Sequence, residues 1–166
     1  MQGYMTSREL LEHAEILYTF VDLFSGYENV PRDYGTGQLF SMTEVHLLNA
    51  IYSNPGITST ELGRRIRRTK GFVSQTISKL EKLGYLVRMA SPSNARRKAL
   101  YVTAAGQKLC VAHNEFDEAT LQKTYHYLLR DCSPAEIVNF YKVLQTYINI
   151  MDAAAAKRRR AAEAQE

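Results

Sequence analysis

Residues 58–103 constrain the fold of this chain more than any other stretch, because each part carries its own local signal. Thr58 and Glu61 have the spacing of a capping box, which predicts the start of a helix. Thr69 is placed to cap a second helix that starts at the next residue. Gly84 follows this second helix at the position where a left-handed cap is favoured. The segment therefore predicts two short helices joined by a tight turn.

The second of these helices has two chemically distinct faces. At about 100° per residue, Val73, Ile77 and Leu80 fall on one side, which predicts the core face. The opposite side holds small polar groups and amines: Gly71, Gln75, Ser78 and Lys82, flanked by Ser74 and Lys79. Two runs rich in β-formers follow at 85–89 and 98–102, joined by the turn sequence Ser-Pro-Ser-Asn. This order predicts a winged helix-turn-helix.

The charge of the chain is concentrated on the same segment. Residues 58–108 hold 12 Lys or Arg side chains against two acids, a net charge of +10. Residues 1–57 have a net charge of −5, and residues 109–166 have −1. A polyanion is the expected partner, because each phosphate that is neutralised releases counterions. The alternative is a merely solvated basic face, which usually carries interspersed acids.

The segment also matches a known sequence pattern. Residues 73–88 fit V-S-x-x-I-x-x-L-E-x-x-G-Y-L-x-R, and residues 96–106 fit R-x-x-x-L-x-V-T-x-x-G. This pattern resembles the MarR family of bacterial and archaeal transcriptional regulators. The chain has Asn94-Ala95-Arg96 where the family often has Asp-x-Arg, so an amide replaces the carboxylate that steadies the arginine. The resemblance implies a dimeric, DNA-binding winged-helix protein.

Three groups of residues form the predicted DNA interface. The helix that starts at Lys70, here the recognition helix, is expected to present these residues: Thr69, Lys70, Gly71, Ser74, Gln75, Ser78 and Lys79. Lys70, Ser74, Gln75 and Ser78 are expected to reach base edges, and Thr69 and Lys79 to contact phosphates. The helix start at Thr58, Ser59 and Thr60 is expected to contact phosphates too. Arg96 and Arg97 of the wing are expected to enter the minor groove.

The first and last predicted helices carry more apolar surface than a small winged domain can cover. Their expected dimerisation residues are Leu10, Leu17 and Val21 in the first helix and Ile137, Tyr141, Leu144 and Ile148 in the last. We expect these helices to meet their symmetry mates across a two-fold axis, as the resemblance also implies. Two recognition helices would then read a near-palindrome in major grooves about 34–36 Å apart. The alternative is that the apolar faces of both helices pack within one chain.

The expected fold class is mostly α with a small β-wing, in which the N- and C-terminal helices form a dimerisation layer. The expected domains are a dimerisation helix and loop at 1–40, the winged helix-turn-helix at 41–106, dimerisation helices at 107–152, and a frayed or disordered basic tail at 153–166. No apolar run approaches about 20 residues, and the N-terminus lacks the order of a signal peptide. With only two cysteines, the chain is expected in a reducing, cytoplasmic compartment.

Other kinds of site have weaker signals. No catalytic motif is present, so we expect no enzyme. We expect none of the four histidines to pair with another strong ligand at an i, i+4 or C-x-x-C type spacing, and we expect neither a cofactor nor a metal site. Metal or redox sensing, through His46 and His113 or through Cys132, remains an alternative. The resemblance implies a small-molecule effector that binds near Tyr34, His46 and Asn49.

The function that these expectations support is a sequence-specific, ligand-responsive repressor that binds DNA as a homodimer. The alternative from another class is a winged-helix interaction module that binds protein or RNA. Such a module would be expected to carry aromatic or apolar residues on the outward face of the recognition helix, where this chain has Gly71, Gln75 and Ser78.

Overall fold

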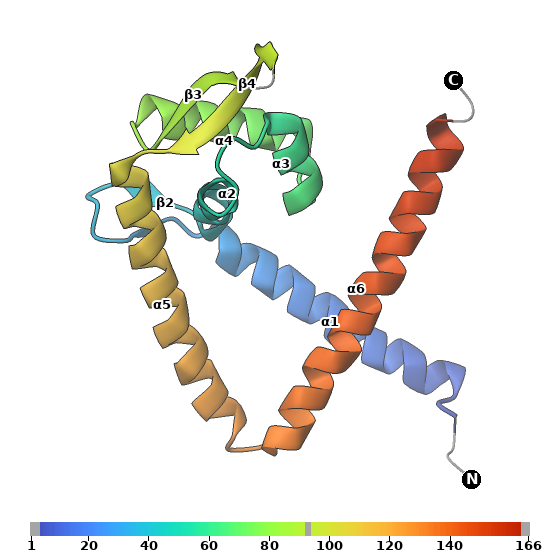
Figure 1. Ribbon diagram of the computed structural model, residues 1–166. Coiled ribbons are helices and arrows are strands. Elements are labelled where there is room, and N and C mark those ends of the chain that lie inside the picture. Colours follow the sequence, from blue (N-terminus) through green and yellow to red (C-terminus); the bar gives the residue numbers. More distant parts are fainter. Residues whose placement is uncertain (1–3, 92–93, 164–166) are drawn as a thin grey trace. The chain divides into compact units, whose positions relative to one another are not determined.

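The computed structural model describes residues 4–91 and 94–163, without the side chains of residues 91, 94–97, 159, 162 and 163 (Figure 1). Its backbone forms two compact units, residues 1–116 and 117–166, and the boundary between them falls inside a helix. Among the described residues, every helix is too short or too polar to span a lipid bilayer.

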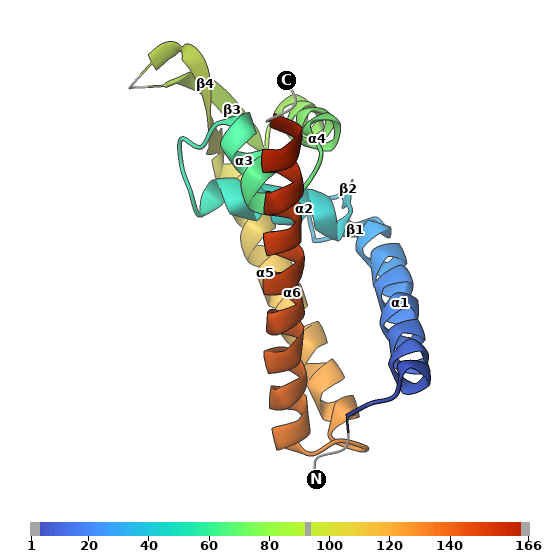
Figure 2. The same ribbon diagram turned by 90° about the vertical axis from the view of Figure 1, so that its right-hand side faces the viewer.

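Over the described residues the fold is mostly helical with two small antiparallel sheets, which confirms the prediction of a mostly α fold with a small β-wing. Its elements are α1 (Ser7–Asn29), β1 (Arg32–Asp33), β2 (Leu39–Phe40), α2 (Met42–Tyr52), α3 (Ser59–Ile66), α4 (Lys70–Lys82), β3 (Leu86–Ser91), β4 (Asn94–Val102), α5 (Ala104–Leu128) and α6 (Pro134–Glu163). In Figures 1 and 2, α2, α3 and α4 cluster beside the β3–β4 hairpin, which is the wing.

The predicted caps are present at both helices of the helix-turn-helix. Thr58 Oγ1 accepts a hydrogen bond from the Glu61 amide at 3.3 Å, and the Glu61 carboxylate accepts one from the Thr58 amide at 2.9 Å. Thr69 Oγ1 accepts from the Phe72 amide at 3.2 Å, which fixes the start of α4 at Lys70. These bonds satisfy amide groups that the first turn of a helix leaves without a partner.

Specific backbone conformations terminate the same two helices at their C-terminal ends. Arg67 ends α3 in the left-handed conformation at φ 53°, which non-glycine residues seldom adopt. Gly84 follows α4 at φ 79°, as its position in the sequence predicts. Both helices of the helix-turn-helix therefore end at residues with left-handed backbone geometry nearby.

The wing is a regular hairpin for most of its length. Leu86 pairs with Val102 and Ala90 with Lys98, and the register shifts between Ala90 and Ser91. The chain before α3 adds to this sheet, because the Leu100 amide donates to the Ile57 carbonyl at 3.0 Å. Both strands extend further toward the tip than the β-former runs predict.

The core of the winged domain forms around α2. Val45, Leu47, Leu48 and Ile51 of this helix are completely buried. The core cluster also contains apolar side chains from the neighbouring elements: Leu62, Val73, Ile77, Leu80, Leu86, Leu100 and Leu109. The buried face of α4 is thus the one that the helical wheel predicts.

The last helix is longer than the sequence predicts. The first helix, α1, runs through Gly26 to Asn29, and its N-cap is Thr6. α6 continues to Glu163, although the sequence predicts a frayed tail from residue 153. The alanines at 153–156 explain this extension, because alanine has the highest intrinsic helix propensity.

Candidate nucleic-acid interface

The outward face of α4 is exposed and carries the predicted base-reading residues. Lys70, Gly71, Ser74, Gln75 and Ser78 are all exposed. The opposite face is buried, with Val73 2% exposed and Leu80 fully covered. The sequence-based assignment of the two faces therefore agrees with the structure, although their contacts with DNA stay a prediction.

Cationic side chains surround this face. Exposed examples in the described part of the chain are Arg64, Arg65, Arg67, Arg68, Lys82, Arg88 and Lys98. Of the predicted phosphate contacts at the start of α3, Thr60 is exposed, whereas Thr58 and Ser59 are half-buried. Arg96 and Arg97 lie in β4, and their side chains lie outside the described part.

Within the described part of the chain, ion pairs with carboxylates hold Lys79, Arg68 and Arg88. Lys79 Nζ lies 2.8 Å from Glu44 Oε1, Arg68 Nη2 lies 3.3 Å from Glu28 Oε2, and Arg88 Nε lies 3.0 Å from Glu81 Oε2. Exposed pairs of this kind contribute about 0–1 kcal/mol each, so a phosphate can compete for the cation. The predicted phosphate contact Lys79 is thus held by α2 in this structure.

A second arginine contact affects a predicted base-reading residue. Arg88 of the wing donates from Nη2 to Ser78 Oγ at 3.3 Å, so the wing and the recognition helix are directly bonded. The sequence places these residues ten positions apart on separate elements, and no local pattern predicts their contact. We expect Ser78 to exchange this bond for one to DNA.

Removing the charge of Glu44 should strengthen DNA binding. Glu44→Gln keeps the capping box of α2, since glutamine also serves at that position, but it releases Lys79 from its ion pair. We expect the affinity for DNA to rise about 2- to 5-fold at low salt, and the slope of log K against log salt to steepen by about 0.9. Fluorescence anisotropy at several salt concentrations measures both quantities.

Glu136→Gln is the matched control for this prediction. Glu136 has the same role at the start of α6, where its carboxylate accepts from the Ser133 amide at 2.8 Å. Hydrogen bonds from the Ser133 hydroxyl and from the Ser133 amide hold the pKa of Glu136 below its ordinary value. An unchanged affinity in Glu44→Gln, equal to that of the control, would show that Lys79 does not reach the DNA.

A cluster of rings lies away from this face, where α2 meets the start of α5. The ring centroids of His46 and His113 are 4.9 Å apart, and the Tyr34 ring meets His113 edge-on at 5.0 Å. His113 and Tyr34 are buried, whereas His46 is exposed. Beside them Asn49 Nδ2 donates to Asn114 Oδ1 at 2.9 Å. The sequence predicts an effector site at Tyr34, His46 and Asn49, and His113 joins them here.

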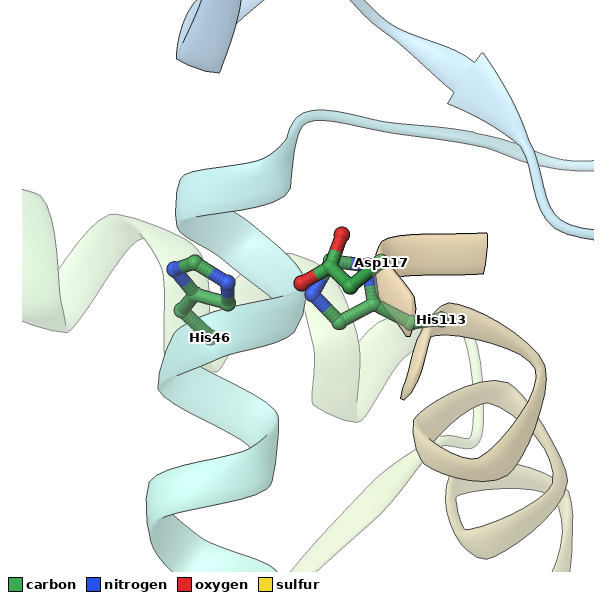
Figure 3. Close-up of side chains that lie close together, drawn as sticks. All are labelled: His46, His113 and Asp117. Atoms are coloured by element: carbon green, nitrogen blue, oxygen red, sulfur yellow. The ribbon is translucent and has the colours of Figure 1, made fainter. Parts of the chain in front are cut away.

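One member of this cluster escapes the sequence analysis. Asp117 lies one turn after His113 on α5, and ligand atoms of His46, His113 and Asp117 all lie within 4.8 Å of one another (Figure 3). The expectation that no histidine pairs with a strong ligand at i, i+4 is wrong, because His113 and Asp117 have this spacing, which places both on one face of a helix.

The two cysteines differ in environment. Cys110 is buried in the core cluster, and this burial raises the pKa of its thiol to about 11. A buried thiol with a raised pKa holds little thiolate at neutral pH, which argues against a redox role for Cys110. Cys132 is half-buried in the turn before α6.

Comparison with known proteins identifies the winged segment. Residues 40–97 match the sequence model of the MarR family. The chain carries a MarR-family winged-helix domain. This confirms the family that residues 73–106 predict.

The MarR assignment agrees with the similarity to individual proteins. Over 91 residues the chain is 29% identical to an uncharacterised HTH-type transcriptional regulator, YhjH, of Bacillus subtilis (strain 168). The match covers 55% of this chain and 52% of YhjH, so the chain spans about half the length of that relative.

Solved structures extend the likeness to most of the fold. The MarR family transcription regulator SP03579 is 19% identical, with a TM-score of 0.68 over 88% of this chain and 97% of that one. FabT of Streptococcus pneumoniae, solved in complex with DNA, is 20% identical, with a TM-score of 0.64 over 89% and 98%. Identities this low show a shared MarR-type fold.

Proposed function

We propose that the protein is a DNA-binding transcriptional regulator that acts as a homodimer. The observation that carries this proposal is the outward face of α4, which is exposed, polar and free of carboxylates from Lys70 to Ser78. It lies on a segment with a net charge of +10. Cations attract the phosphates without regard to sequence, while Gln75 and Ser74 offer hydrogen bonds to base edges.

The same face argues against the interaction-module alternative. A surface that binds protein is enriched in aromatic residues, and one that binds single-stranded RNA uses aromatic rings for stacking. The described aromatic residue of α4, Phe72, is half-buried and packs against the core. The structure of FabT, whose fold is similar, was solved with DNA bound, which supports DNA as the partner of this protein.

Exposed apolar surface on α1 and α6 supports the homodimer. α1 has no buried residue, and Leu10 and Val21 are 55% and 53% exposed. Among the predicted residues of α6, Tyr141 is exposed while Leu144 and Ile148 are half-buried. Ile137 is buried in the single chain, so we leave it out of the proposed interface. Large apolar surfaces of this kind mark protein–protein contacts.

As a homodimer, the regulator would read a near-palindromic operator, because two-fold symmetry repeats the recognition helix on both half-sites. We further propose that it acts as a repressor and that an effector changes its affinity for DNA. Such an effector must bind one arrangement of the two recognition helices better than the other.

Fluorescence anisotropy with the DNA upstream of its own gene tests this function. We expect the wild-type protein to bind this duplex roughly a thousandfold more tightly than a scrambled duplex. Gln75→Ala should lose about 1–3 kcal/mol of this discrimination, because glutamine can pair with adenine through two hydrogen bonds.

Gln38→Ala serves as the control, since Gln38 is exposed in the loop between β1 and β2 and is not part of α4. If Gln75→Ala still distinguishes the upstream duplex from the scrambled one as the wild type does, base recognition by α4 is contradicted. Equal affinity of the wild type for both duplexes would contradict specific binding to this DNA.

A further inference from the structure

We propose that the last turns of α6 are a second DNA-binding element, separate from the winged domain. Lys157, Arg158, Arg159 and Arg160 are four consecutive cations there, and together they form the basic collar. The collar binds phosphates of the DNA backbone. This inference rests on the proposed function, since it adds a contact to the same partner, double-stranded DNA.

The basic collar belongs to a continuous helix. The sequence predicts a frayed tail from residue 153, but α6 runs without a break from Pro134 to Glu163 (Figures 1 and 2). Its last large apolar side chains are Ile150 and Met151, and the alanines at 153–156 follow them. The collar therefore lies just beyond the apolar part of α6. Because its backbone is already helical, binding needs no further ordering of the chain there.

The described cations of the collar are available to a ligand. Lys157, Arg158 and Arg160 are exposed. None of the ion pairs found among the described residues holds any of the three, whereas Arg68 and Lys79 of the winged domain are each paired with a glutamate. A phosphate that binds the three therefore displaces no carboxylate found in the described part of the chain.

The helix distributes the four cations around its axis. At 3.6 residues per turn, consecutive side chains are about 100° apart, so the four surround α6 and every side of the helix presents a cation. An arginine fits a phosphate through two parallel hydrogen bonds, and a lysine contributes a point charge. Since the four do not share one face, we expect one or two phosphates to be bound by each chain.

Charge density favours DNA over the acidic residues of a second copy of this chain. The collar places four charges within about 4.5 Å along the helix axis, and B-DNA carries one phosphate per about 1.7 Å of its own axis. On α1, the acids Glu9, Glu12, Glu15 and Asp22 are spread over about 20 Å. DNA is the denser anion, and neutralising its phosphates also releases condensed counterions.

The triple variant Lys157→Gln, Arg158→Gln, Arg160→Gln tests the collar. Glutamine has nearly the helix propensity of lysine and arginine, so α6 should stay helical, which circular dichroism checks. We expect the slope of log K against log salt to become shallower by at least about 1.8, which is about 0.9 for one phosphate in each chain of the dimer. Affinity at about 0.1 M salt should fall about 10- to 100-fold, as measured by fluorescence anisotropy.

Lys123→Gln, Arg130→Gln and Lys142→Gln together are the matched control. They remove the same charge from exposed positions outside the winged domain and outside the collar. We expect this control to keep the salt dependence of the wild type. An equal loss of affinity in both triple variants would show a general effect of net charge and overturn the proposal. An unchanged salt slope in the collar variant would overturn it as well.

The ratio of affinities for two duplexes identifies the contact as one to phosphates. Phosphates carry no sequence information, so the collar variant should lose affinity for the upstream duplex and for a scrambled duplex by the same factor. A loss confined to one duplex would contradict a phosphate contact. If the wild type binds both duplexes equally and the collar variant is weaker on each, the proposed function fails while the collar stands as a DNA contact.

Sedimentation of both triple variants tests the competing partner. Both should have the oligomeric state of the wild type, because the collar binds DNA and not a second copy of the chain. A collar variant that dissociates further than the wild type and the control would assign these cations to contacts between copies, and would overturn the proposal.

Discussion

Replacing both Tyr141 and Ile148 by aspartate should convert the protein to monomers and lower its DNA affinity by more than about 100-fold. Tyr141 is 56% exposed and Ile148 is half-buried, and the two side chains lie seven positions apart on one face of α6. Burial of each in a dimer contributes about 1.5–3 kcal/mol, and an unpaired carboxylate in an apolar interface adds several more against association. A monomer contacts a single half-site, so it loses the gain that comes from linking two binding events.

Sedimentation at micromolar concentration measures the oligomeric state, and anisotropy measures the binding of DNA. Asn139→Asp with Thr146→Asp is the matched control, because it adds two carboxylates on the opposite side of the same helix, at exposed polar positions. A Tyr141→Asp, Ile148→Asp protein that stays dimeric would show that this face of α6 is not the interface.

Gly106→Ala should destabilise the protein, whereas Gly71→Ala should not. A Cβ atom on Gly106 would overlap the Tyr85 carbonyl oxygen and lie 2.5 Å from Val102 Cγ1, so backbone has to move. Overpacking of this kind costs about 1–3 kcal/mol and occasionally more. A Cβ on Gly71 meets nothing within 4 Å, and alanine there should stabilise α4 by up to about 1 kcal/mol.

Urea denaturation of both variants gives the two free energies of unfolding. The loss of stability at Gly106 has a specific structural cause, because this residue lies in the first turn of α5, directly after β4. Thr103 Oγ1 accepts there from the Gly106 amide at 3.2 Å and donates to the Gly84 carbonyl at 2.7 Å. Equal stability of Gly106→Ala and the wild type would contradict this tight approach of α5 to the start of the wing.

The winged helix-turn-helix could be predicted from the sequence because its signals are local. Thr58 with Glu61, Thr69 and Gly84 each act over a few residues, and each has the expected role in the structure. The buried and exposed faces of α4 follow from helical periodicity alone. The lengths of α1 and α6 were harder to predict, since Gly26 and the alanines at 153–156 give weak signals.

Contacts between distant residues could not be predicted in this way. Glu44 and Lys79 are 35 residues apart, and only the packing of α2 beside α4 brings them together. His46 meets His113 for the same reason, through α2 and α5. The sequence shows that Lys79 belongs to the basic segment, but it does not show that Lys79 forms an ion pair with a carboxylate. The sequence likewise does not show which apolar face of α6 is covered by the chain itself.

Selection of bound duplexes from a random pool tests the central claim most directly, because it assumes no particular target. The wild-type protein should enrich one near-palindromic motif whose two half-sites lie about 10 base pairs apart, centre to centre. The Gln75→Ala variant, selected in parallel, should relax the preference at specific positions in each half-site. A pool that shows no motif after selection, despite strong salt-dependent binding, would contradict sequence reading by α4 and leave a nonspecific nucleic-acid binder.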